Sequence, residues 1–219
     1  MFLSYLLDKN SPSYGNRNKF EISKKSDISK GDVANDSHMS TTVHIGTHID
    51  MPYHFYREGQ TIEDYESAFW FFKKPLIIEI RQQDLIIRDN LIERLKTIKD
   101  DKYDILIVKT GICDRRDCED FWNRNYGFHP DIYDLLCNQF KSIRVLGFDS
   151  ISVSSLQDRM LGRESHLRFL NPQRPILLLE DMDLTAVTEE TNFKEIIVAP
   201  LRIASCDGLP CTVIGKLNG

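Results

Sequence analysis

Cysteine is scarce in this sequence and follows no pattern that would indicate a disulfide framework or a thiolate metal site. Five of the 219 residues are cysteines, an odd number, and no two of them have CxxC spacing. Small secreted domains use dense, paired cysteines, and thiolate zinc sites use closely spaced ones. We therefore expect reduced cysteines and a cytoplasmic protein.

Long apolar runs are absent as well. No stretch approaches the roughly 20 apolar residues of a transmembrane helix. The N-terminal segment, residues 1–8, is apolar but short, and it lacks the positive region and the cleavage site of a signal peptide. We expect no membrane partner.

The charge balance shows no basic excess. Lysine and arginine number 28 against 33 aspartates and glutamates, which gives a formal net charge of -5. The densest basic clusters are the pairs Lys24-Lys25 and Arg115-Arg116, and such pairs are typical of a solvated, mixed surface. A nucleic-acid partner would require a basic patch or stripe, so we expect none.

Length and composition indicate one domain that spans residues 1–219. The polar stretch 8–36 is too small to fold separately and is typical of loops around short strands. A chain of this size buries enough surface to fold without a structural ion, so a metal site here would serve chemistry.

Apolar runs predict strands, and helical periodicity predicts helices between them. One helix is expected over 91–95 with Asp89 as its cap, and another from Pro130 to Phe140. Because strands outnumber helices, we predict an α/β fold with a mixed, β-rich sheet and flanking helices. The expected strands are 76–80, 104–109, 143–148, 175–180, 196–199 and 212–214.

Four residues with metal-binding side chains, His44, His48, Asp50 and His54, lie within one short segment. Imidazole nitrogen and carboxylate oxygen together suit zinc, manganese or iron. His48 and Asp50 share a face of an extended strand, and Gly46 can bend the chain so that His44 converges on them. Ordinary strand histidines are the alternative, but the clustering of four such residues favours a metal site.

His54 is the predicted catalytic residue. A bound divalent ion creates a nucleophile by lowering the pKa of its water, and a histidine nearby titrates in the range needed to move the proton. The alternative role for His54 is that of a further metal ligand.

A second imidazole–carboxylate pair, His166 and Glu180, lies far along the chain. Glu180 ends an apolar strand, where a buried carboxylate is costly unless it is paired or bound to a cation. A salt bridge at a strand end is the simpler explanation of these two residues taken alone.

The segment His44-x-Gly-Thr-His48-x-Asp50-x-Pro52-x-His54 resembles the motif of the metal-dependent cyclase family, which includes bacterial kynurenine formamidases and isatin hydrolases. Weaker similarity continues along nearly the whole chain. It covers Thr110-Gly111, residues 147–152, His166, Glu180, residues 199–201 and residues 207–210.

The resemblance implies a swivelling β/β/α fold and a role for each residue of the site. His44, His48 and Asp50 would hold a first ion, and Asp50, His166 and Glu180 would help to hold a second where one is present. His54 would be catalytic. The resemblance also implies one or two divalent ions, zinc or manganese, and a homodimer or homotetramer.

The function predicted from this resemblance is hydrolysis of a C–N amide bond in a small aromatic or cyclic substrate. Four aromatic residues, Tyr53, Phe55, Trp70 and Phe71, could wall a pocket, although core packing explains Trp70 and Phe71 equally well. A cyclase or dehydratase of a biosynthetic pathway would use the same metal. A non-catalytic binding protein on the same fold is a third alternative, which the intact ligand set disfavours.

Overall fold

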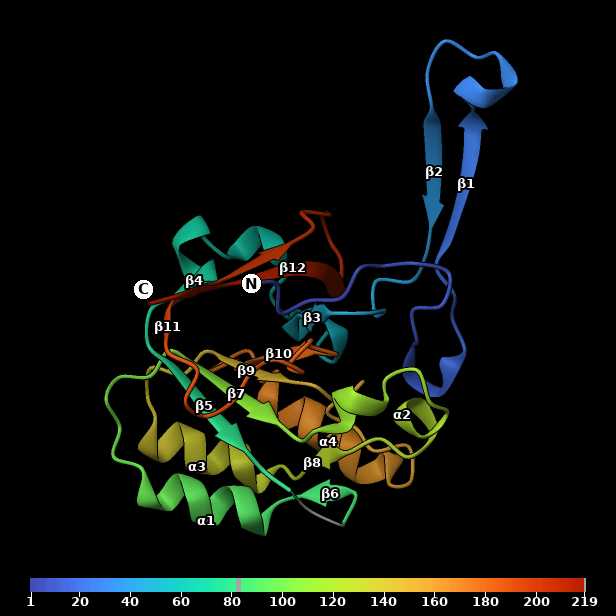
Figure 1. Cartoon of the computed structure of the whole chain (residues 1–219). Coiled ribbons are helices and arrows are strands. Elements are labelled where there is room, and N and C mark those ends of the chain that lie inside the picture. The colour runs from blue at the N-terminus through green and yellow to red at the C-terminus, as the bar shows by residue number, and fades with distance from the viewer. Residues whose placement is uncertain (82–83, 219) are drawn as a thin grey trace.

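A computed structural model describes residues 1–81 and 84–218, and an eight-stranded mixed sheet forms its centre (Figure 1). The order of strands across this sheet is β4-β11-β12-β3-β10-β9-β7-β5. Their bounds are β3 His48–Asp50, β4 Phe71–Phe72, β5 Pro75–Glu79, β7 Ile105–Lys109, β9 Val145–Phe148, β10 Leu177–Glu180, β11 Phe193–Pro200 and β12 Gly208–Leu217.

Strand β3 lies where the parallel and antiparallel halves of the sheet meet. β5, β7, β9 and β10 pair with one another in parallel, whereas β3 is antiparallel to both of its neighbours, β10 and β12. Strands β7, β9 and β10 are buried along almost their whole length, as expected for strands covered on both faces. The edge strand β5 buries only Leu76 and Ile78. Each of the six segments predicted as strands overlaps one, and the predicted mixed, β-rich α/β fold is confirmed.

Helices α1 (Asp89–Thr97), α3 (Asp131–Gln139) and α4 (Arg159–Phe169) lie together along one face of the sheet (Figure 1). α1 and α3 are the two predicted helices, and each turns a leucine-containing stripe into the core. Asp89, expected as the cap of α1, is instead its first residue, and Arg88 occupies the N-cap position. α4 was not predicted from the sequence, because its buried face consists of Gly162, Ser165 and His166, with Phe169 as the one large apolar residue of that face. An amphipathic pattern is the main sequence signal of a surface helix, and α4 has little of it.

Shorter elements connect these layers. The four-residue helix α2 spans Asp120–Asn123, and strands β6 (Ile86–Ile87) and β8 (Gly127–Phe128) form a small parallel sheet. The 3-10 helices are η1 Tyr14–Asn16, η2 Ile28–Lys30, η3 Pro52–His54, η4 Ile62–Asp64, η5 Ser67–Trp70 and η6 Ile112–Arg115.

A hairpin arm, residues 21–40, projects away from the body of the protein (Figure 1). It is formed by β1 (Glu21–Ser26) and β2 (Asp36–Ser40), which pair antiparallel from Glu21 opposite Ser40 to Ser26 opposite Asp36. Nearly all of its residues are exposed. The polar stretch 8–36 was expected to hold loops and short strands, but the sequence did not indicate that the strands would extend outward as one arm.

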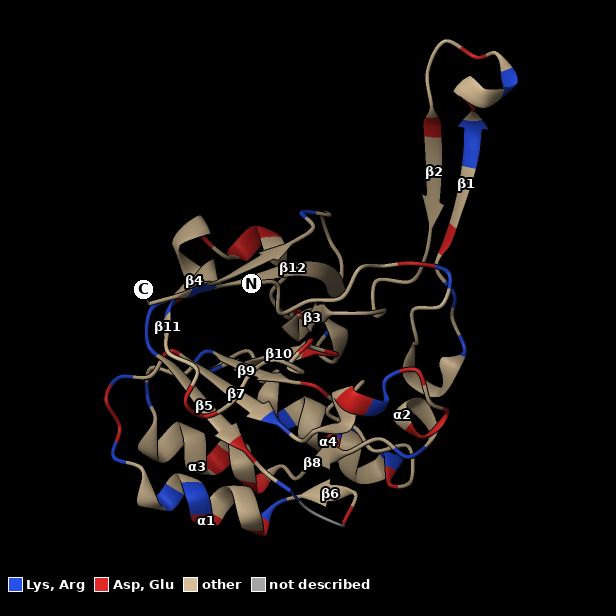
Figure 2. Ribbon diagram, viewed as in Figure 1, with Lys and Arg blue, Asp and Glu red and all other residues tan. Residues whose placement is uncertain are grey.

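Charges of both signs are interspersed over the molecule, without a stripe of one sign along any element (Figure 2). Across the described residues, every helix is too short or too polar to cross a membrane.

Candidate active site

The histidine-rich segment folds as its local chemistry predicts and lines a cavity of about 650 Å³. His48 and Asp50 lie on the buried strand β3, while His44 precedes it and His54 ends the 3-10 helix η3 behind Pro52. Gly46 has φ of 58°, in the left-handed region that favours glycine. This turn places Nδ1 of His44 2.8 Å from Oδ1 of Asp50.

The strand register brings Glu180 to the same place. In the β3–β10 ladder Glu180 lies opposite His48, and Leu178 lies opposite Asp50. Nδ1 of His48 donates to the carbonyl of Gly46 at 2.8 Å, so Nε2 is the nitrogen directed to the carboxylates. Nε2 lies 3.4 Å from Oε2 of Glu180 and 3.5 Å from Oδ1 of Asp50.

His166 approaches Asp50 from helix α4. Its Nδ1 lies 2.9 Å from the carbonyl of Gly162 and 3.1 Å from Oγ of Ser154. These contacts leave Nε2 to face Asp50, 3.5 Å from Oδ2. Because His166 lies on a helix, the backbone fixes its ring more firmly than a loop would.

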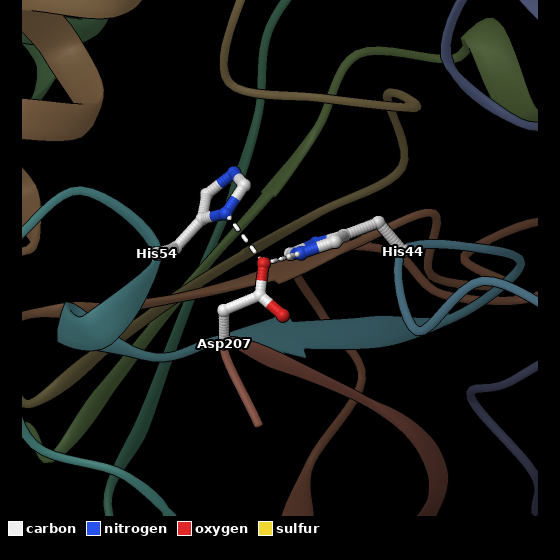
Figure 3. A group of neighbouring side chains, drawn as sticks. All are labelled: His44, His54 and Asp207. Carbon is white, nitrogen blue, oxygen red and sulfur yellow. Dashed lines mark hydrogen bonds and ion pairs between the residues drawn. The ribbon is translucent and has the colours of Figure 1, made fainter. Parts of the chain in front are cut away.

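Asp207 is the residue of the site that the sequence analysis did not identify. Its Oδ2 lies 2.9 Å from Nε2 of His44 and 3.0 Å from Nδ1 of His54 (Figure 3). The only signal in the sequence was that Asp207 begins a closing segment, 207–210, similar to one in the cyclase family. Nothing in that position indicates a contact with the two histidines.

The histidines and carboxylates of the site shift one another's pKa values. Burial by itself would lower the pKa of His44, but Asp50 and Asp207 outweigh it and raise that pKa to about 10. Burial would raise the pKa of Asp50, but His44 and His166 hold it well below its usual value. Hydrogen bonds from His44 and His54 likewise lower the pKa of Asp207.

The donor set fits a divalent cation. Among the described residues, His44, His48 and Asp50 present ligand atoms within 4.8 Å of one another, as do Asp50, His54 and His166. Asp50 and Glu180 are almost fully buried, and buried carboxylates need a cation or donors beside them. Imidazole and carboxylate together are the ligands that zinc and similar ions prefer.

A buried ion pair lies directly behind two of these candidate ligands. Arg116 donates from Nε and Nη2 to the two carboxylate oxygens of Asp181, at 2.8 and 2.6 Å. The carbonyl of Asp181 accepts a hydrogen bond from Oγ1 of Thr47 at 2.5 Å. Because Asp181 follows Glu180 and Thr47 precedes His48, this network ties the two ligand-bearing strands together. The expectation of a solvated Arg115-Arg116 surface is therefore wrong for Arg116.

The four predicted substrate-binding aromatics are not brought together. Phe55 lines the cavity and stacks on the ring of His166, with centroids 4.6 Å apart and planes 15° apart. Tyr53 and Phe71 are exposed outside the cavity lining. Trp70 is buried against Tyr65 and Phe69, which is the core-packing alternative.

Comparison with known proteins gives the family. The Cyclase family model matches residues 2–155, more than half of the 219 residues. The chain belongs to the Cyclase family. This confirms the resemblance seen in the segment from His44 to His54.

Curated members similar to this Cyclase-family chain are kynurenine formamidases. Those of Bacillus cytotoxicus and Bacillus cereus are 26% and 27% identical to it over 182 and 176 residues, and each alignment covers 80% of this chain and 77% of the relative.

Solved structures share the fold. Isatin hydrolase A from Labrenzia aggregata, bound to benzyl benzoate, superposes with a TM-score of 0.82 at 17% identity, covering 100% of this chain and 93% of that one. A predicted metal-dependent hydrolase from Bacillus stearothermophilus gives a TM-score of 0.75 at 20% identity and covers 98% and 96%.

Proposed function

We propose that this member of the Cyclase family is a metal-dependent hydrolase that cleaves C–N amide bonds other than peptide bonds, in a small aromatic or cyclic substrate. The observation that supports this most is the convergence of five candidate ligands on one cavity, beside a histidine held by Asp207. The names of its relatives, kynurenine formamidase and isatin hydrolase, support an amide as the substrate.

In such a reaction the oxygen of water bonds to the carbonyl carbon, the C–N bond breaks, and the nitrogen leaves with a proton. A bound divalent ion would polarise the carbonyl and lower the pKa of water. His54 takes the proton from water and returns it to the leaving nitrogen. Asp207 fixes its tautomer: it accepts the proton of Nδ1 at 3.0 Å and leaves Nε2 as the nitrogen that exchanges protons.

Two ions, zinc or manganese, suit the arrangement around Asp50. One carboxylate oxygen, Oδ1, faces His44 and His48, whereas the other, Oδ2, faces His166. Asp50 can therefore serve two ligand sets at once, with Glu180 beside His48. The partly buried ring of Phe55, stacked on His166, supplies an apolar wall for an aromatic or cyclic substrate.

Metal analysis and turnover together test this function. Protein purified without chelator is expected to contain one or two divalent ions per chain and to hydrolyse formanilide or a cyclic aryl amide. His54→Ala should retain the metal but lose about 10²–10⁴-fold in turnover, and Glu180→Ala should lower the metal content. His129→Ala, a histidine outside the cavity lining, is the matched control and should change neither.

Two results would contradict the proposal. One is metal-loaded protein that hydrolyses neither substrate. The other is full activity in His54→Ala. Loss of the ion in that variant would instead make His54 a ligand and transfer the proton role elsewhere.

We also propose that the chain forms a homodimer or homotetramer, with the hairpin arm packed on a second copy. A lone two-stranded hairpin is marginally stable in water, and this arm exposes Ile22, Ile28, Val33 and Met39. Sedimentation at micromolar concentration should give a multiple of 25.5 kDa. Deletion of residues 22–39 should yield a monomer, and a monomeric parent protein would reject the assembly.

A further inference from the structure

Two exposed arginines at the cavity have no carboxylate partner among the described residues. Arg159 and Arg163, both on α4, line the same cavity as His44 and Glu180. Within residues 1–81 and 84–218, no carboxylate forms an ion pair with either guanidinium, whereas Arg168 on the same helix pairs with Asp134. Arginine is the side chain best suited to bind a carboxylate, through a planar fork of donors.

The spacing of these arginines aligns them with the candidate metal centre. Residues 159, 163 and 166 follow one another at i, i+4 and i+7, so they share one face of α4. At a rise of about 1.5 Å per residue, the Cα atom of Arg163 lies about 4.5 Å and that of Arg159 about 10.5 Å along the helix axis from His166. Arg159 and Arg163 therefore line the cavity from the same face of α4 that carries His166.

The position of this face is set by close packing at Gly162. A Cβ at Gly162 would overlap with Ser154, the residue whose hydroxyl contacts Nδ1 of His166. The helix approaches the neighbouring loop as closely as it does because glycine stands there. The packing of Gly162 against Ser154, which helps to orient His166, therefore also fixes the face of α4 on which Arg159 and Arg163 lie.

The rest of the cavity has an acidic inner end and apolar walls. Its inner end holds the carboxylates of Asp50 and Glu180, which repel an anion, while Phe55, Ile151 and Met160 line its walls. A flat aromatic substrate with an anionic group is therefore oriented in one direction only. Its anion faces the arginines, and its neutral amide faces the histidines.

We propose that the substrate carries a carboxylate that Arg159 and Arg163 bind, so that the enzyme acts on anionic aromatic amides in preference to neutral ones. This inference rests on the proposed amide hydrolysis for the reaction, but it concerns recognition and has its own binding test. Arg159 and Arg163 are in this sense specificity-determining residues that take no part in proton transfer.

Binding of product analogues separates recognition from turnover. The probes are 4-aminobenzoate, which has a carboxylate, and aniline, which does not, titrated by calorimetry into the metal-loaded full-length protein. The parent protein should bind 4-aminobenzoate more tightly, with a preference that weakens in high salt. A variant with both Arg159→Gln and Arg163→Gln should lose about ten- to a hundredfold in that affinity, as expected for charge-assisted hydrogen bonds.

Arg168→Gln is the matched control on the same helix, and it should leave both affinities unchanged. Kinetics with 4-formamidobenzoate and formanilide supply a second readout, in which the double variant raises KM for the anionic substrate alone. Equal affinity of the parent protein for the two probes, or an unchanged preference in the double variant, would overturn the inference. A clear preference without turnover of either formamide would instead reject the proposed hydrolysis and leave the recognition intact.

Discussion

Replacing Arg116 by methionine removes one partner of the buried ion pair behind the candidate metal ligands. The two hydrogen bonds to Asp181, at 2.8 and 2.6 Å, are lost, while the carboxylate of Asp181 remains fully buried. Burial already raises the pKa of Asp181, and Arg116 offsets part of that effect. Breaking a buried pair from one side costs about 3–5 kcal/mol, because an uncompensated charge stays in the interior.

Urea denaturation of the metal-free protein, followed by the fluorescence of its two tryptophans, measures this loss. With a slope of about 3 kcal/mol per molar urea, the midpoint should fall by about 1–1.7 M. A chelator is required throughout, because an ion bound only to the folded state would add its own stabilisation.

Arg168→Met provides the comparison. Its pair with Asp134 lies at the surface, so its removal should cost about 0–1 kcal/mol. Adding Asp181→Asn to Arg116→Met should restore part of the lost stability, because the stranded charge disappears. A loss below 1 kcal/mol for Arg116→Met, or no recovery in the double variant, would refute this account of the network.

Three further predictions concern the site itself. The pKa of His44 is raised to about 10, and those of His48 and His166 are raised as well, so a metal that binds through these residues must displace protons at neutral pH. Apparent affinity should therefore rise by at least about tenfold per pH unit from pH 7 to 9, and a flat profile in calorimetry would contradict the assignment of His44 as a ligand. Gly46→Ala forces an L-residue to φ near 58° and should cost about 1–3 kcal/mol in urea denaturation; an unchanged midpoint would show that the turn relaxes freely. Gly162→Ala should weaken metal binding in an equilibrium titration, because its methyl group overlaps with Ser154 and displaces His166. Unaltered metal affinity in that variant would show that the packing of α4 at Gly162 does not position a metal ligand.

Local chemistry explains why much of this protein could be predicted from sequence. The spacing of His44, His48 and Asp50, the freedom of Gly46 and the break at Pro52 act within one short segment, so their geometry follows from backbone rules. The strands were found for a similar reason, since a continuous apolar run such as 177–179 is itself the signal of a strand buried on both faces.

The contacts that complete the site come from strand register and helix packing, and these are properties of the whole fold. Glu180 meets His48 because β10 pairs with β3 in one register, and Asp207 meets His44 and His54 because it directly precedes β12, which pairs with the other edge of β3. Helix α4 has a polar buried face, so its apolar pattern is too weak to reveal it, yet it supplies His166 together with Arg159 and Arg163. The sequence by itself determined which residues have the chemistry of a metal site, because that depends on side-chain type and local spacing. The tertiary structure decided which distant carboxylates and cations surround them. Strand register and helix packing depend on two remote segments together, so they cannot be inferred from the residues of either segment alone.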